Sequence, residues 1–291
     1  EITARTLVIT DADGIGASDP ATPWGWQTNP YALDTNIERL VIAGPAGQAG
    51  SDGEAYILER NGLPYILADI EGSLNVATVA GAIGLNAAAP VTNLVDIYSS
   101  DGEVVLTAAT ALTVDQIDAR RGRIELVAQN GDLMDRGGSA LVTGGDIILS
   151  ASGTVGTAGN FFNTQTLASS ITQNRGTSYY GANYSTDYAT LDATVTTPAG
   201  TVGVIDFMQT GGGVLEVLSA TTTDGYVKIT NDGADMIADL VTAGGDGEVF
   251  LGTGTTGDIG LGVVTAMDDD IVIGAGIDLA TLTGTPAFAA G

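Results

Sequence analysis

Short runs of alternating apolar and polar residues, each closed by glycine, aspartate or asparagine, recur along most of this chain. The region 101–160 shows the pattern most clearly, with runs at 104–107, 112–117, 123–127, 140–142 and 146–150. Each run has the length of a β-strand, and none is long enough for a substantial helix. We therefore predict an all-β chain whose strands are joined by tight corners.

Comparable strands recur about every 20 residues, which is the length of one coil in a right-handed parallel β-helix, a β-solenoid. About 14 such coils would stack with neighbouring strands roughly 4.8 Å apart. Ile147 and Leu149 should then point to one side of their strand, and Ile148 and Ser150 to the other. Tandem β-sandwich domains are the alternative architecture.

The sequence also contains a repetition with a much longer period than the strands. Segment 7–10 resembles 147–150, and segment 101–107 resembles 224–230. We interpret these similarities as two diverged blocks, residues 1–139 and 140–291, which can also form one continuous solenoid. Chance similarity among strands rich in Thr, Gly and Val is the alternative.

Glycine provides 42 of the 291 residues, and many glycines follow aspartate or asparagine. Such pairs, for example Asp52-Gly53, Asp101-Gly102 and Asp224-Gly225, readily form tight corners. The composition is too apolar for a disordered chain. The glycines therefore predict corners between strands.

The chain contains no cysteine and no histidine, which excludes disulfides, thiolate chemistry, histidine-based triads and typical zinc sites. Its formal net charge is −26, and Lys228 is its only lysine. Because phosphate binding needs a basic surface, a nucleic-acid partner is excluded.

The sequence has no apolar run near the 18 residues of a membrane-spanning segment, so we predict no membrane insertion. Charged residues make up only 15% of the chain. The surface must then rely on Thr, Ser, Asn and Gly, as in secreted bacterial β-proteins. We predict an extracellular or cell-surface location, and a processed protein or a piece of a longer one.

Segments 122–133 and 145–156 resemble the G-x-I-x-L-x-A-x-x-G-x-I coil of large bacterial exoproteins similar to filamentous haemagglutinin. The resemblance covers residues 101–160 well and the remainder loosely. It implies a right-handed parallel β-helix and a role as a surface fibre or adhesin. Residues 1–291 do not include the N-terminal secretion domain of that family, so the resemblance implies no export route.

Acidic turns suggest calcium as a ligand, because Ca²⁺ prefers carboxylate oxygens. Segment 244–251 is close to the nonapeptide of calcium-binding β-rolls, with a glutamate where aspartate is expected. Solvated acidic turns are the alternative. The candidate ligands are Asp11, Asp13, Asp246, Glu248, Asp268, Asp269 and Asp270.

Two segments rich in aromatic residues are candidate binding loops, with glycans as one class of partner. Aromatic side chains on protruding loops suit contact surfaces. A purely structural role, as covers of a coil edge, is the alternative. The candidates are Trp24, Trp26, Tyr179, Tyr180, Tyr184 and Tyr188.

We predict that the chain is not an enzyme, and we assign no catalytic residue. The alternative is a carbohydrate-active β-helix, a glycan hydrolase, lyase or binding module. Paired carboxylates are what glycoside hydrolysis needs. Asp115 with Asp118, and Asp235 with Asp239, are the pairs that this alternative would use.

The leading hypothesis is a structural segment of an extracellular fibre, surface layer or adhesin. The chain enters a strand pattern at once, and open β-edges recruit other chains. We therefore predict that the chain assembles with itself or with neighbouring segments of a longer polypeptide. Ile2, Leu7 and Ile9 are the predicted assembly residues.

Overall fold

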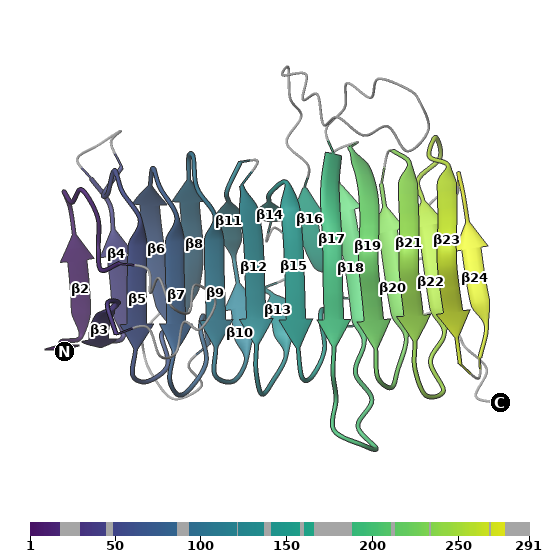
Figure 1. The fold of residues 1–291 in the computed structure, drawn as a ribbon, viewed down its shortest axis with the longest axis horizontal. Coiled ribbons are helices and arrows are strands. Elements are labelled where there is room, and N and C mark those ends of the chain that lie inside the picture. The colour runs from purple at the N-terminus through teal and green to yellow at the C-terminus, as the bar shows by residue number, and fades with distance from the viewer. Residues whose placement is uncertain are drawn as a thin grey trace.

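The chain forms a solenoid of short parallel strands that stand side by side along one axis (Figure 1). A computed structural model describes residues 1–17, 30–44, 49–85, 93–120, 122–136, 141–157, 160–165, 188–210, 213–232, 234–267 and 269–276. Over these residues every regular element is a β-strand and no helix occurs. The all-β prediction and the solenoid prediction are confirmed.

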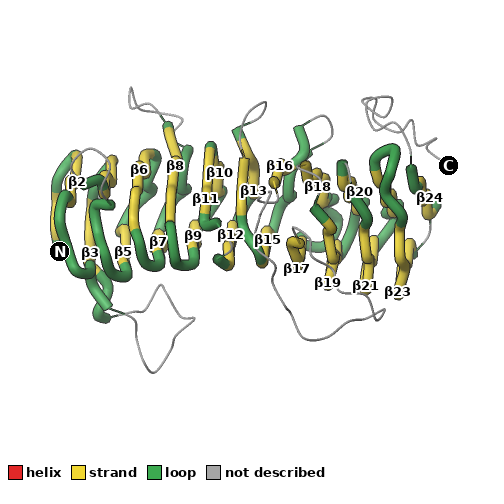
Figure 2. The backbone as a smooth tube through the Cα atoms, turned by 90° about the horizontal axis from the view of Figure 1, so that it is seen from above, coloured by secondary structure: helices red, strands yellow, loops and turns green. Residues whose placement is uncertain are grey.

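Two sheets of eleven strands form the long walls of the solenoid, and Figure 2 shows them as two rows. The first sheet contains β1 (Ile2–Thr3), β3 (Leu33–Asn36), β5 (Ala55–Glu59), β7 (Leu74–Thr78), β9 (Val104–Ala108), β12 (Arg123–Ala128), β15 (Asp146–Ala151), β17 (Tyr188–Val195), β19 (Val214–Thr222), β21 (Met236–Ala243) and β23 (Ile259–Ala266).

The second sheet faces the first across the core. It contains β2 (Thr6–Ile9), β4 (Arg39–Ile42), β6 (Tyr65–Ile70), β8 (Leu94–Ser99), β11 (Gln116–Asp118), β14 (Leu141–Thr143), β16 (Phe162–Gln165), β18 (Ile205–Thr210), β20 (Val227–Asn231), β22 (Val249–Thr253) and β24 (Ile271–Gly274). A third, short side is formed by β10 (Leu112–Val114) and β13 (Leu133–Asp135).

Every pair of neighbouring strands in these sheets is parallel. A β-sandwich consists of antiparallel sheets, so the alternative of tandem sandwiches is wrong. Both main sheets also continue across residue 140, because β12 pairs with β15 and β11 pairs with β14.

The core follows the alternation of side chains along each strand. Ile147 and Leu149 are each 1% exposed, whereas Ile148 and Ser150 lie on the outer face. This confirms the predicted directions in β15. Equivalent inward residues on successive strands form ladders that run along the axis, and the register shifts only locally between β17 and β19, at Leu191 and Asp192. One ladder in the second sheet stacks Phe162, Phe207, Ile229 and Leu251, all fully buried.

Glycines line two corners where backbones of successive coils approach closely. A Cβ atom added to Gly102 would lie 2.3 Å from the carbonyl carbon of Gly72, and one added to Gly122 would lie 1.9 Å from the carbonyl oxygen of Gly102. Gly225 occupies the other corner with a φ of +119°. The predicted corner glycines are confirmed at Gly102 and Gly225.

Replacing Gly225 with alanine should lower the free energy of unfolding by about 1 to 3 kcal/mol, because φ is positive and the new Cβ would meet an oxygen. That oxygen is the carbonyl of Gly203, 2.1 Å from the Cβ position. Gly260→Ala is the matched control, because its Cβ would find its nearest atom 3.9 Å away. Urea denaturation should separate the variants, and equal midpoints would contradict the steric argument.

The number of coils differs from the sequence prediction. Over the described residues, each main sheet holds eleven strands, fewer than the expected 14 coils. The physical reason is that coils vary in length: β12 and β15 begin at Arg123 and Asp146, but the next strand of the same sheet, β17, begins only at Tyr188. Extra residues in a connection do not disturb the pairing of the strands on either side. The spacing of strands along the sequence is therefore free to vary.

The similar segments that suggested two blocks lie in different sheets. Segment 7–10 includes most of β2 in the second sheet, whereas segment 147–150 belongs to β15 in the first. Segment 101–107 leads into β9 in the first sheet, and segment 224–230 leads into β20 in the second. The similarity thus relates a strand and its preceding corner on one wall to those on the other. The boundary at residue 140 stays a prediction.

Polar side chains inside the solenoid satisfy the backbone at its corners. Asn231 donates from Nδ2 to the carbonyl oxygens of Gly213 at 3.0 Å and Asp235 at 2.8 Å. Thr253, its register partner on the next coil, donates to the carbonyl of Gly257 at 2.6 Å. Buried backbone groups need such partners, so this polar ladder stabilises the turns between the two walls.

Candidate functional site

The predicted metal ligands lie in two separate places. Asp11 and Asp13 are exposed between β2 and β3, near one end of the solenoid (Figure 1). The others flank β22 and β24 near the opposite end: Asp246 and Glu248 precede β22, Asp269 and Asp270 precede β24, and Asp268 lies outside the described residues. Among the residues that the structure describes, no three acidic side chains come together as a metal site. Calcium binding stays a prediction.

Glu248 is the exceptional member of this acidic group, because it is only 6% exposed. Its Oε2 atom has no hydrogen-bond partner. Burial, followed by the negative charges of Asp269 and Asp270, raises the pKa of the Glu248 carboxyl to about 7. The Glu248 side chain is therefore partly protonated near neutral pH.

The predicted aromatic binding loops cannot be placed on the solenoid. Trp24, Trp26, Tyr179, Tyr180 and Tyr184 lie outside the described residues. The backbone of Tyr188 begins β17. The glycan-binding role of these residues stays a prediction.

The first carboxylate pair considered for glycan hydrolysis is bound by arginines. Asp115 accepts from Arg136 Nε at 2.5 Å and from the backbone amide of Val95 at 2.7 Å. Asp118 accepts from the backbone amide of Arg120 at 2.9 Å. Both carboxyl groups are therefore engaged by other residues of the solenoid.

In the second pair, Asp239 lies in the strand β21 and Asp235 immediately precedes that strand. Asp235 accepts from the backbone amide of Asp258 at 2.9 Å, which connects two successive coils. Asp239 lies within the strand and is partly exposed. Four positions separate the two residues along an extended segment, so the strand itself spreads them apart.

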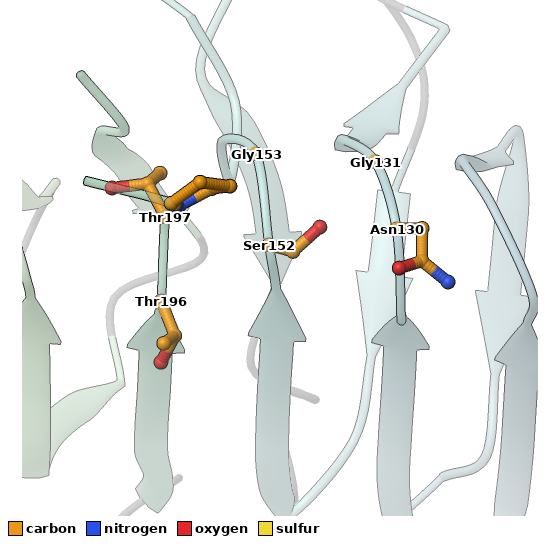
Figure 3. A pocket seen from close by; sticks show the side chains of 7 residues that line it. Asn130, Gly131, Ser152, Gly153, Thr196 and Thr197 are labelled. Atoms are coloured by element: carbon orange, nitrogen blue, oxygen red, sulfur yellow. The ribbon is translucent and has the colours of Figure 1, made fainter. Parts of the chain in front are cut away.

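A shallow groove of about 490 Å³ follows the ends of β12, β15 and β17 (Figure 3). Its side chains are neutral, and none is aromatic or acidic. Figure 3 shows the hydroxyl and amide groups spaced along successive coils. The lining residues are Asn130, Gly131, Ser152, Gly153, Thr196, Thr197 and Pro198.

The two ends of the described solenoid expose side chains that face the core elsewhere. Ile271 and Ile273 in β24 are 45% and 41% exposed, although their register partners in β22, Val249 and Leu251, are fully buried. In β23, Leu261 is 49% exposed. An inward-facing side chain at an end has a neighbouring coil on one side only, which explains the exposure.

The opposite end repeats this arrangement with the predicted assembly residues. Ile2 in β1 is 36% exposed, and Leu7 and Ile9 in β2 are partly buried against the core. Their partners in β4, Leu40 and Ile42, are fully buried. The structure therefore brings Ile2, Leu7 and Ile9 together on one end face.

A buried ion pair on the outer face of the second sheet was not anticipated from the sequence. Asp206 in β18 and Lys228 in β20 are direct register partners. The Lys228 Nζ atom lies 3.7 Å from Asp206 Oδ1, and the two side chains are 12% and 1% exposed. The ammonium also lies 5.4 Å from the ring centroid of Phe161.

Burial dominates the electrostatics of this pair. It raises the pKa of the Asp206 carboxyl to about 6, and the neighbouring Lys228 and Tyr226 offset only part of that increase. Burial and the nearby carboxylate also raise the pKa of Tyr226. The available sequence signal was the only lysine of the chain, but nothing local indicates that it faces an aspartate one coil earlier.

Within the described residues, no helix has the length and apolar character that a membrane crossing would require. Searches against protein-family models, curated protein sequences and solved structures found no significant match to this chain. Over its described residues, the chain is a parallel β-solenoid that exposes apolar side chains at both ends and holds a buried Lys–Asp pair on its wall.

Proposed function

We propose that this chain is a structural unit of an extracellular fibre, surface layer or adhesin, and that its copies stack end to end. The single observation that carries the proposal is the exposure of core-facing side chains at both ends. Leu261, Ile271 and Ile273 are exposed at one end, and Ile2 is exposed at the other. Covering such surface is favourable by roughly 25 cal/mol for each Å² of apolar area removed from water.

Strand direction supports head-to-tail stacking of copies in one sense only. All strands of each main sheet run parallel, so β1 and β2 of one copy can extend β23 and β24 of another without reversal. The contact is heterologous, because it joins two different faces. A head-to-tail contact that does not close on itself generates a filament.

The side chains also match in register. If inward positions continue the core ladder, Ile271 lies opposite Leu7 of the next copy and Ile273 lies opposite Ile9. The same alignment places two exposed outward residues together, Val272 at 41% and Val8 at 56%. The second sheet can then continue from β24 to β2 with apolar contacts on both faces.

Charge supports the same register. Two residues before Ile271 and Leu7, this register places the exposed Asp269 opposite Arg5, whose side chain is 68% exposed. Arg5 is paired with Glu38 at 3.1 Å, and an exposed pair of this kind can exchange partners at little cost. In a chain with a net charge of −26, the position of this cation favours one pairing of the ends.

Ile273→Asp should abolish this end-to-end assembly, because the substitution places a charge in the middle of the apolar contact. Leu240→Asp is the matched control: Leu240 is 39% exposed, but it lies on the outer face of β21 rather than at an end. Sedimentation and electron microscopy should show filaments for the unchanged chain and the control only. A wild-type chain that stays monomeric at high concentration would contradict the proposal.

A charge exchange tests the register separately. Arg5→Asp and Asp269→Arg should each weaken association, and the double variant should restore it, because the pair is only reversed. The expected change is up to about fivefold in the association constant, as for an exposed ion pair of up to 1 kcal/mol. Additive losses in the double variant would exclude this register while leaving end stacking itself in place.

A further inference from the structure

The Lys228–Asp206 pair combines features that an ordinary surface ion pair lacks. It joins directly opposite positions on two neighbouring strands, β20 and β18. Its carboxylate is 1% exposed, and neither of the carboxylate oxygens has a hydrogen-bond partner within normal distance. A buried carboxylate without partners is costly, so the pair gains little stability as two charges.

Apolar and aromatic groups surround the reacting atoms. The ring of Phe161 lies 5.4 Å from Lys228 Nζ, and Phe250, the register partner of Lys228 on the following coil, is 6% exposed. A low-dielectric environment disfavours separated charges and favours the neutral amine and carboxylic acid. The raised pKa of Asp206 has burial as its largest cause, which agrees with this environment.

We propose that Lys228 Nζ and Asp206 Cγ form an intramolecular amide bond that joins β20 covalently to β18. The inference rests on the geometry of this pair and is independent of the proposed end-to-end assembly. Position supplies the main kinetic advantage, since two groups held in contact react as if at very high concentration.

The atoms of this reaction balance without an oxidant or a cofactor. A proton passes from the Lys228 ammonium to the Asp206 carboxylate, which gives an amine and a carboxylic acid. The nitrogen lone pair attacks Cγ and forms the C–N bond. One C–O bond then breaks, and the hydroxyl leaves with a proton from the nitrogen as water. The net change is ammonium plus carboxylate to amide plus water.

Tyr226 is positioned to assist the proton transfers. It lies two residues before Lys228, and burial, followed by the neighbouring Asp206 carboxyl, raises the pKa of the Tyr226 phenol. A hydroxyl both donates and accepts a proton, so it can transfer one to the departing oxygen. We assign Tyr226 as the residue that transfers protons during formation of the same bond.

The bond would connect two successive coils in a chain that contains no cysteine. It would close the segment 206–228 into a loop, which restricts the unfolded chain as a disulfide does. It would also remove both charges from the buried site. A solenoid contacts only its neighbouring coils, so one such bond prevents those two coils from separating.

The sequence permits a decisive test by proteolysis. Lys228 is the only lysine, and no arginine follows Arg175. After trypsin digestion of the denatured wild-type chain, the part that follows Arg175 should therefore remain a single fragment, 176–291, because trypsin does not cleave after an amidated lysine. Mass spectrometry should find this fragment lighter by one water molecule than its sequence requires.

Two variants provide the controls. Asp206→Ala should restore cleavage after residue 228 and yield fragments 176–228 and 229–291 at full mass. Lys228→Arg should be cleaved at the same place, because its guanidinium does not form the bond. Both measurements use denatured chains, so a variant that folds poorly still reports whether residue 228 is blocked.

Either of two results would overturn the inference. One is wild-type protein cleaved after Lys228 into two fragments of full mass, which would show an ion pair only. The other is an uncleaved fragment that persists in Asp206→Ala, which would show that another group blocks the lysine. After cell-free synthesis, a Tyr226→Phe chain should form the uncleavable fragment more slowly than the wild type, and an unchanged rate would remove the role assigned to Tyr226.

Discussion

Phe207→Ala is expected to lower the free energy of unfolding by about 3 to 5 kcal/mol, the usual cost of removing a buried aromatic ring. Phe207 is fully buried in the inward ladder of the second sheet, between Phe162 on one coil and Ile229 on the next. Neither neighbour can move into the space without leaving its own strand position. Urea denaturation followed by circular dichroism measures the loss.

The neighbouring residue is the matched control for this variant. Met208 lies on the outer face of the same strand and is partly exposed, so Met208→Ala should change the free energy by less than about 1 kcal/mol. Similar losses for both variants would contradict the assignment of inward and outward faces in β18.

The damage from Phe207→Ala should also remain local. Coils of a solenoid contact mainly their neighbours, so stability is distributed along the axis. Amide hydrogen exchange should accelerate in β16, β18 and β20 while β5 and β6 keep their protection. Uniform acceleration over the whole chain would indicate a single cooperative unit instead.

Glu248→Gln is expected to remove a pH dependence from folding stability. The folded-state pKa of Glu248 is raised from 4.5 to about 7, so the folded chain binds this proton more tightly than the unfolded chain does. Its stabilising contribution is complete below about pH 4.5 and is lost as pH rises through 7. The total amounts to at most about 3 kcal/mol.

The variant should therefore be more stable than the wild type at pH 8 and nearly equal to it at pH 4.5. The difference between the two proteins isolates this residue, since Asp206 and the exposed carboxyls are common to both. Urea unfolding at pH 4.5, 6 and 8 in a chelating buffer makes the comparison without bound metal. A difference that does not change with pH would contradict the raised pKa.

The sequence by itself determined the local structure of this chain. Alternation at residues 146–150 correctly placed Ile147 and Leu149 in the core, because successive side chains of a strand point in opposite directions. The Asp-Gly pair at 101–102 correctly indicated a corner, because its backbone meets the corner of the preceding coil too closely for a Cβ atom. These properties depend on a few consecutive residues, so they can be read from a short segment.

The parallel solenoid itself was also predictable, since short strands at regular spacing with corner glycines suit stacked coils. The number of coils was not, because the connection between β15 and β17 is far longer than that between β12 and β15. A local pattern that is shared by both walls also cannot show to which wall a strand belongs. This is why similar segments were found in opposite sheets.

Only the tertiary structure decided which distant residues meet. Lys228 faces Asp206 because β20 stacks on β18 in one register, and a shift of β20 by one residue would turn Lys228 toward the core and away from Asp206. The same stacking buries Glu248 beside Asp269 and Asp270 and leaves Ile271 and Ile273 uncovered at the last coil. These features arise from contacts between successive coils. The register is selected by the free energy of stacking several strands together, which no single strand determines.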